Sequence, residues 1–108
     1  MKNYAPMIIL NTTFHIHDEV HGDALDYLKT IYIPQATKSG IFSEPHLRKI
    51  FGHDGDDGHS YSVQFSVADL EALEKWNEIT GRALNAELVA RFSDKIAGFS
   101  TLLQEVDL

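Results

Sequence analysis

Residues 60–67, Ser-Tyr-Ser-Val-Gln-Phe-Ser-Val, decide how this chain folds. Every second residue of this stretch is large and apolar: Tyr61, Val63, Phe65 and Val67. A period of two is typical of a β-strand that is buried on one face only. The apolar set must therefore lie under helices, and Gln64 and the serines must point to the opposite face of the sheet.

Three further strands are expected around this one. Residues 46–53 also alternate, and the turn-forming residues 54–58 between the two stretches predict a hairpin. Residues 7–17 and 96–106 alternate as well. In residues 7–17 the more apolar set should face the helices, which leaves Ile9, Asn11, Thr13 and His15 on the other face.

Two helices separate these strands. Residues 18–38 carry an apolar stripe at helical spacing, and Pro34 is expected to kink or end this helix. A second stripe runs to Phe92 and contains Trp76, which we expect in the core. We expect residues 66–69 to open the second helix as a capping box, and Thr80-Gly81 to bend it.

The resulting order βαββαβ predicts one α+β domain of the ferredoxin-like class over residues 7–108, after a loose leader over residues 1–6. Right-handed crossovers place both helices on one face of a four-stranded antiparallel sheet. The other face is left open, and it is half polar. It is expected either to pair with a second copy around a polar-lined cavity or to be wetted in a monomer.

The candidate ligand site is this open face. Its predicted residues are Asn11, Thr13, His15, Arg48, Ser62 and Gln64, with Tyr32 reaching in from the first helix. His15 could serve as an acid or base near neutral pH, and Arg48 could hold a carboxylate. The competing interpretation is that these groups form hydrogen bonds in a wet dimer interface.

Composition excludes several classes of function. The net charge of −7 argues against a general nucleic-acid binder and against docking on an anionic membrane. The absence of cysteine excludes disulfides and cysteine-ligated metals. No stretch approaches the length of a membrane span, so we expect a soluble, cytoplasmic protein.

We predict no metal and no cofactor. His15 and His17 share a strand face and His21 follows, but a solvated strand end explains them better than a zinc or copper site. Residues 53–59 contain carboxylates, the groups that calcium sites use. They do not form an EF-hand loop, because the twelfth position from Asp54 is Phe65 rather than glutamate.

Several stretches resemble one family. They are residues 8–13, 32–34, 39–42, 60–65, 84–88 with 91–92, and 99–103. Together they are similar to the bacterial family filed as domain of unknown function 4286. The resemblance implies a dimeric α+β barrel in which two sheets face each other. The wider superfamily includes haem-degrading enzymes, but their axial histidine on the second helix has no counterpart here, since no histidine follows His59.

Three hypotheses follow for function. The first is a homodimeric module that binds a small molecule between its sheets. The second is a cofactor-independent enzyme of the monooxygenase or isomerase kind that uses His15 in the same cavity. The third is a structural or partner-binding protein without an enclosed cavity.

Overall fold

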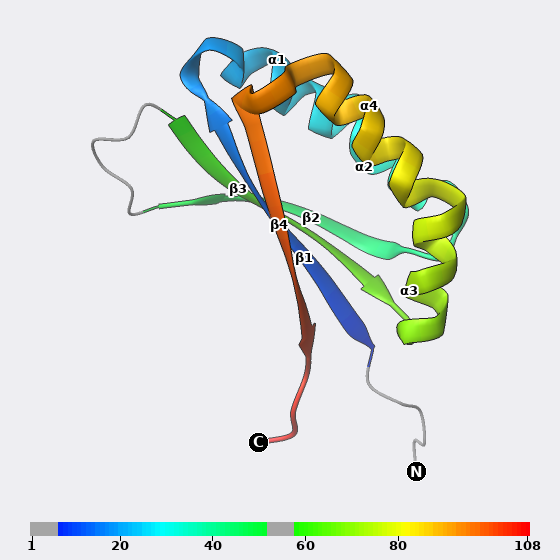
Figure 1. The fold of residues 1–108 in the computed structure, drawn as a ribbon. Coiled ribbons are helices and arrows are strands. Elements are labelled where there is room, and N and C mark those ends of the chain that lie inside the picture. Colours follow the sequence, from blue (N-terminus) through cyan, green and yellow to red (C-terminus); the bar gives the residue numbers. More distant parts are fainter. Residues whose placement is uncertain (1–6, 52–57) are drawn as a thin grey trace.

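A computed structural model describes residues 7–51 and 58–108. The strands of the sheet are β1 (Ile8–His17), β2 (Ser43–Ile50), β3 (Gly58–Val67) and β4 (Ile96–Gln104), and the helices are α1 (His21–Tyr27), α2 (Ile33–Thr37), α3 (Leu70–Trp76) and α4 (Arg82–Phe92). The sheet has four antiparallel strands in the order β2-β3-β1-β4. All helices lie on one side of it, so the predicted ferredoxin-like α+β fold is confirmed (Figure 1).

The register of β1 and β3 explains why one face is covered. Phe14 lies opposite Tyr61 and Thr12 opposite Val63, and these side chains are buried beneath the helices. The hydrophobic core also includes Phe65, which is 2% exposed. The alternation of residues 60–67 therefore placed its apolar set correctly.

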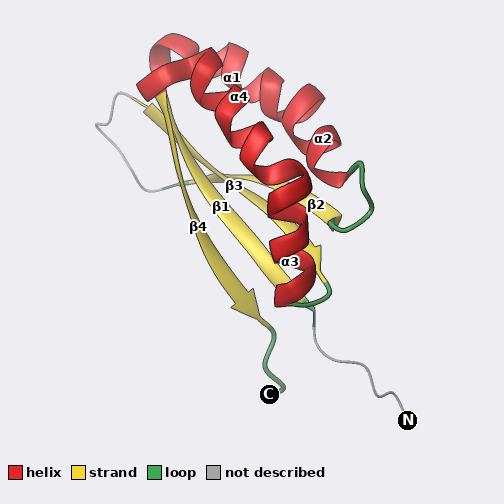
Figure 2. Cartoon of the chain, turned by 45° about the vertical axis from the view of Figure 1, so that its right-hand side comes forward, coloured by secondary structure: helices red, strands yellow, loops and turns green. Residues whose placement is uncertain are grey.

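The edge strand β4 is covered far less than the others. Ile96 is buried, but the rest of β4 is exposed, including Phe99 at 67% and Leu103 at 43%. The helical layer lies over the other strands, and the far end of β4 extends beyond it (Figure 2). This strand thus carries apolar side chains that nothing in one chain buries.

A π-helical turn joins α1 to α2, and a second one joins α3 to α4. The first joins α1 to α2 over Leu28–Tyr32, where the N–H of Ile33 donates to the carbonyl of Leu28. Pro34 then falls in the first turn of α2, where a missing N–H costs little, so the helix continues to Thr37 instead of ending at the proline.

The second π-helical turn, Asn77–Gly81, joins α3 to α4 at the predicted bend. Gly81 is required there, because a Cβ atom would lie 2.5 Å from the ring of Trp76. Trp76 is buried as expected, and its Nε1–H donates to the carbonyl of Ala36 at 2.8 Å.

Several predicted boundaries are wrong, and the last strand, for example, ends at Gln104 rather than at residue 106. The second helix is capped by Asp69, whose carboxylate accepts the N–H of Ala72 at 2.8 Å, because Ser66 still belongs to β3. Strand β2 begins at Ser43 rather than at residue 46, because Ser43 pairs with Ser66 beyond a bulge.

Some predictions remain outside the described residues. The predicted leader over residues 1–6 lies there, as do residues 52–57, which hold most of the predicted turn and of the candidate calcium loop. Within the described parts of the chain, no helix has the length and apolar character needed to cross a membrane.

Candidate ligand-binding site

The open face of the sheet is organised in rows that cross all four strands. Strand pairing places side chains from opposite residues on the same face. One row is Thr101, Asn11, Gln64 and His46, and the next is Phe99, Thr13, Ser62 and Arg48. Most of the polar residues lie on β1, β3 and β2, whereas β4 contributes Thr101 and the exposed ring of Phe99.

A network of hydrogen bonds joins three of these strands. Arg48 donates from Nη1 to Gln64 Oε1 at 3.2 Å, and Gln64 donates from Nε2 to Asn11 Oδ1 at 3.3 Å. Ser62 also donates to Asn11 Oδ1, and Asn11 Nδ2 donates to Thr13 Oγ1 at 3.3 Å. Because Asn11 Oδ1 accepts from Ser62 and Gln64 while its Nδ2 donates to Thr13, the Asn11 amide is fixed in orientation at the centre of the sheet.

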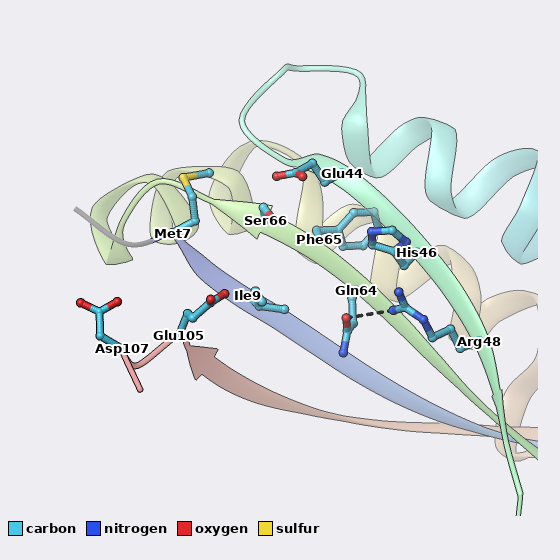
Figure 3. A pocket seen from close by; sticks show the side chains of 10 residues that line it. All are labelled: Met7, Ile9, Glu44, His46, Arg48, Gln64, Phe65, Ser66, Glu105 and Asp107. Carbon is cyan, nitrogen blue, oxygen red and sulfur yellow. Dashed lines mark hydrogen bonds between the residues drawn. The ribbon is translucent and has the colours of Figure 1, made fainter. Parts of the chain in front are cut away.

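Beside this network the open face is hollowed into a groove with a volume of about 690 Å³. Its walls come from the start of β1, the bulged start of β2, the end of β3 and the segment after β4 (Figure 3). The lining residues are Met7, Ile9, Glu44, His46, Arg48, Gln64, Phe65, Ser66, Glu105 and Asp107. His46 and Arg48 lie on β2 together with Glu44, whereas Glu105 and Asp107 lie across the groove on the segment after β4 (Figure 3).

The predicted site residues divide into three groups. Arg48 and Gln64 line the groove. Asn11, Thr13 and Ser62 lie next to it in the hydrogen-bonded network. His15 lies farther along β1, where its Nδ1 is 3.1 Å from the hydroxyl of Ser60, and it does not line the groove.

The prediction for Tyr32 is wrong. Its ring is 9% exposed and packs edge-on against Phe14, at a centroid distance of 5.5 Å, between the helices and the sheet. A residue on that side cannot reach the open face, because the sheet lies between them. Burial raises the pKa of Tyr32 to about 12, so its hydroxyl stays protonated in the core.

Sequence reasoning missed several lining residues: Met7, Glu44, His46, Glu105 and Asp107. His46 could have been found, because it lies opposite Gln64 once β2 is paired with β3. Glu44 could not, since it lies in the bulge with a φ of 50°, immediately before Pro45. A bulge redirects side chains that simple alternation would place elsewhere.

The histidines near the hairpin end interact with protein groups. His17 Nδ1 accepts the N–H of Glu19 at 3.1 Å, and His21 Nε2 lies 2.8 Å from the hydroxyl of Tyr61. His59 stacks on His21 at 3.8 Å and pairs with Asp18 at 2.8 Å. In residues 7–51 and 58–108, no group of at least three His, Cys, Asp or Glu residues is arranged to hold a metal ion.

Solved structures share this fold at low sequence identity. A dimeric ferredoxin-like protein from an uncultured marine organism is 14% identical, with 96% of this chain and 99% of that chain covered and a TM-score of 0.63. A hypothetical protein from Arabidopsis thaliana is 11% identical, with 100% and 96% covered and a TM-score of 0.70.

HapK from Hahella chejuensis is 12% identical, with 93% of this chain and 92% of that chain covered and a TM-score of 0.65. No curated protein matches the chain. At such identities the solved structures establish the fold alone. The sequence model of the DUF4286 family, a domain of unknown function, matches residues 7–106, and the chain therefore belongs to the DUF4286 family.

Proposed function

We propose that this protein is a homodimeric binding module whose two sheets meet through their open faces and enclose a small molecule. The observation that carries the proposal is the hydrogen-bonded network of Arg48, Gln64 and Asn11 beside a groove of about 690 Å³. Ligand sites in proteins combine a concave shape with a few fixed polar groups.

The apolar side of the same face supports association. Phe99 is 67% exposed and Leu103 is 43% exposed, and register places them on the open face beside Thr13 and Ile9. Burying an aromatic side chain of this size contributes roughly 2 kcal/mol. A second copy would cover these side chains and close the groove. Two solved proteins of the same fold are described as dimeric.

Binding is favoured over acid–base catalysis by the position of His15. The enzyme hypothesis needs this imidazole in the cavity, whereas its Nδ1 lies 3.1 Å from Ser60 and it does not line the groove. The residues that do line it hold and orient a polar molecule. The proposal therefore assigns the open face to binding.

Sedimentation of matched variants tests the assembly. We expect the wild-type chain to sediment at twice its chain mass, and Phe99→Glu to sediment as a folded monomer because a charge on this face opposes burial. Ile79→Glu is the control, since Ile79 is 58% exposed but lies in the turn between α3 and α4. A wild-type monomer, or a dimer unaffected by Phe99→Glu, contradicts the proposal.

A crystal structure of the dimer tests the cavity. We expect electron density for a small molecule between the sheets, near Arg48 and Gln64. Partner side chains that fill the groove completely would leave an interface without a ligand site and would favour the structural hypothesis.

A further inference from the structure

We infer that the groove takes a small bipolar molecule, with an anionic group at one end and a cationic amine at the other. This inference rests on the proposed function and adds the chemical class of the ligand. It follows from the distribution of charge around the groove (Figure 3).

The anionic group belongs at the end formed by β2. Arg48 uses one nitrogen to hold Gln64, and a guanidinium has further N–H donors in a fork that matches a carboxylate. His46, which lies opposite Gln64, adds an imidazole to the same wall. In the part of the chain that the structure describes, the ion pairs are His59–Asp18 and Lys95–Glu19, so no protein carboxylate neutralises Arg48.

The cationic group belongs at the end lined by carboxylates. Glu105 and Asp107 come from the segment after β4 and form this end, whereas Glu44 lies in the bulge of β2, on the same strand as His46 and Arg48 (Figure 3). These carboxylates reach one groove from separate parts of the chain, and no described basic side chain forms an ion pair with them. Glu44 is held there with a φ of 50°, a conformation that only the surrounding structure can maintain.

The groove between its charged ends suits a short carbon chain. Met7 and Ile9 supply apolar surface, and Gln64 and Ser66 supply polar groups. A polyanion such as nucleic acid is disfavoured, because the carboxylates and the net charge of −7 repel it. A purely apolar ligand would leave the charges of Arg48 and the carboxylates buried in the dimer without ionic partners, which is costly.

Calorimetric titration of the full chain with matched probes tests this inference. The probes are 6-aminohexanoate, hexanoate and hexylamine, which share one carbon chain, with 4-aminobutyrate and 8-aminooctanoate to vary the separation of the charges. We expect at least one amino acid of this series to bind about tenfold more tightly than hexanoate and hexylamine, since charge-assisted hydrogen bonds then form at both ends.

Variants assign the two ends. Arg48→Gln should abolish the preference over hexylamine, and the double variant Glu105→Gln, Asp107→Asn should abolish the preference over hexanoate. Glu71→Gln, at an exposed position in the first turn of α3, is the matched control and should change nothing.

The outcomes separate this inference from the proposed function. If the chain is a dimer and all probes bind equally, or the monofunctional probes bind more tightly, the bipolar class is wrong while a ligand cavity remains. If the preference exists but survives both sets of charge-removing substitutions, the assignment of the ends is wrong. A wild-type monomer in sedimentation overturns the proposed function itself, whichever probe binds.

Discussion

The helix-covered face and the open face of the sheet come from alternate residues of the same strands, and they differ in what their side chains contact. On the covered face, Phe65 stacks on Phe42 at 5.0 Å and is 2% exposed. On the open face, the adjacent Gln64 hydrogen-bonds to Arg48 and Asn11. The burial of apolar side chains therefore concentrates stability on the covered face. The polar side chains of the open face are left available for a binding site.

The largest expected effect on stability comes from replacing each of these two neighbouring residues, Phe65 and Gln64, with alanine. Phe65→Ala should lower the free energy of unfolding by about 3–5 kcal/mol, because it leaves a cavity in the core. Gln64→Ala should lower it by only about 1 kcal/mol, because its hydrogen bonds are partly exposed. Urea unfolding of both variants at one protein concentration gives the two values. Equal losses would show that the open face stabilises the fold as much as the core does.

The covered face also carries polar groups, and two of its tyrosines differ in whether their hydroxyl is hydrogen-bonded. The hydroxyl of Tyr61 lies 2.8 Å from His21 Nε2, whereas the hydroxyl of Tyr27 is buried with no hydrogen-bond partner among the described residues. Tyr61→Phe should cost about 1 kcal/mol, and Tyr27→Phe should be neutral or stabilising by up to about 1 kcal/mol, because it removes an unsatisfied hydroxyl. Thermal unfolding distinguishes them, and a clear loss of stability in Tyr27→Phe contradicts this reading.

The sequence predicted the covered face better than the site, for physical reasons. Burial of an alternating strand is a strong constraint, so the core positions of β3 follow from residues 60–67 alone. The faces on which Arg48 and His46 lie follow from the pairing of β2 with β3. The alternation of β2 alone does not give them, because a bulge between Ser43 and His46 interrupts it. Glu105 continues the alternation of Phe99 and Leu103 in the predicted strand, but β4 ends at Gln104, so the path of the segment after it sets the position of Glu105 in the groove.

Tyr32 shows a different limit of sequence reasoning. It is the last residue of the π-helical turn Leu28–Tyr32, where the hydrogen-bonding step lengthens and the phase of the helix changes. The spacing of residues along an ideal α-helix is therefore a poor guide to the direction of the Tyr32 side chain. Because both helices lie on the covered side of the sheet, as predicted, its ring packs against Phe14 and cannot reach the open face (Figure 1).

The smallest expected effect is the dependence of stability on pH that comes from His21, which lies at the end of the covered face where α1 meets β3. Burial lowers the pKa of His21 from its ordinary 6.5, with added repulsion from His59 and Lys49 and an opposing attraction from Asp18. As the pH falls, the unfolded chain therefore binds the proton before the folded chain does. The stability gained from neutral His21 is fully present above pH 6.5 and is lost as the pH falls through the lowered pKa.

A non-titrating variant isolates this effect. The free energy of unfolding of the wild-type chain, minus that of His21→Gln, should be constant above pH 6.5 and should decrease progressively below it. The difference includes the repulsion between His21 and His59, whose rings stack at 3.8 Å. Ile79→Gln in both backgrounds serves as a control, because Ile79 is 58% exposed in the turn between α3 and α4 and the substitution adds no titrating group. A difference that stays flat as the solution is acidified, or that increases, would show that burial and the neighbouring positive charges do not lower the pKa of His21.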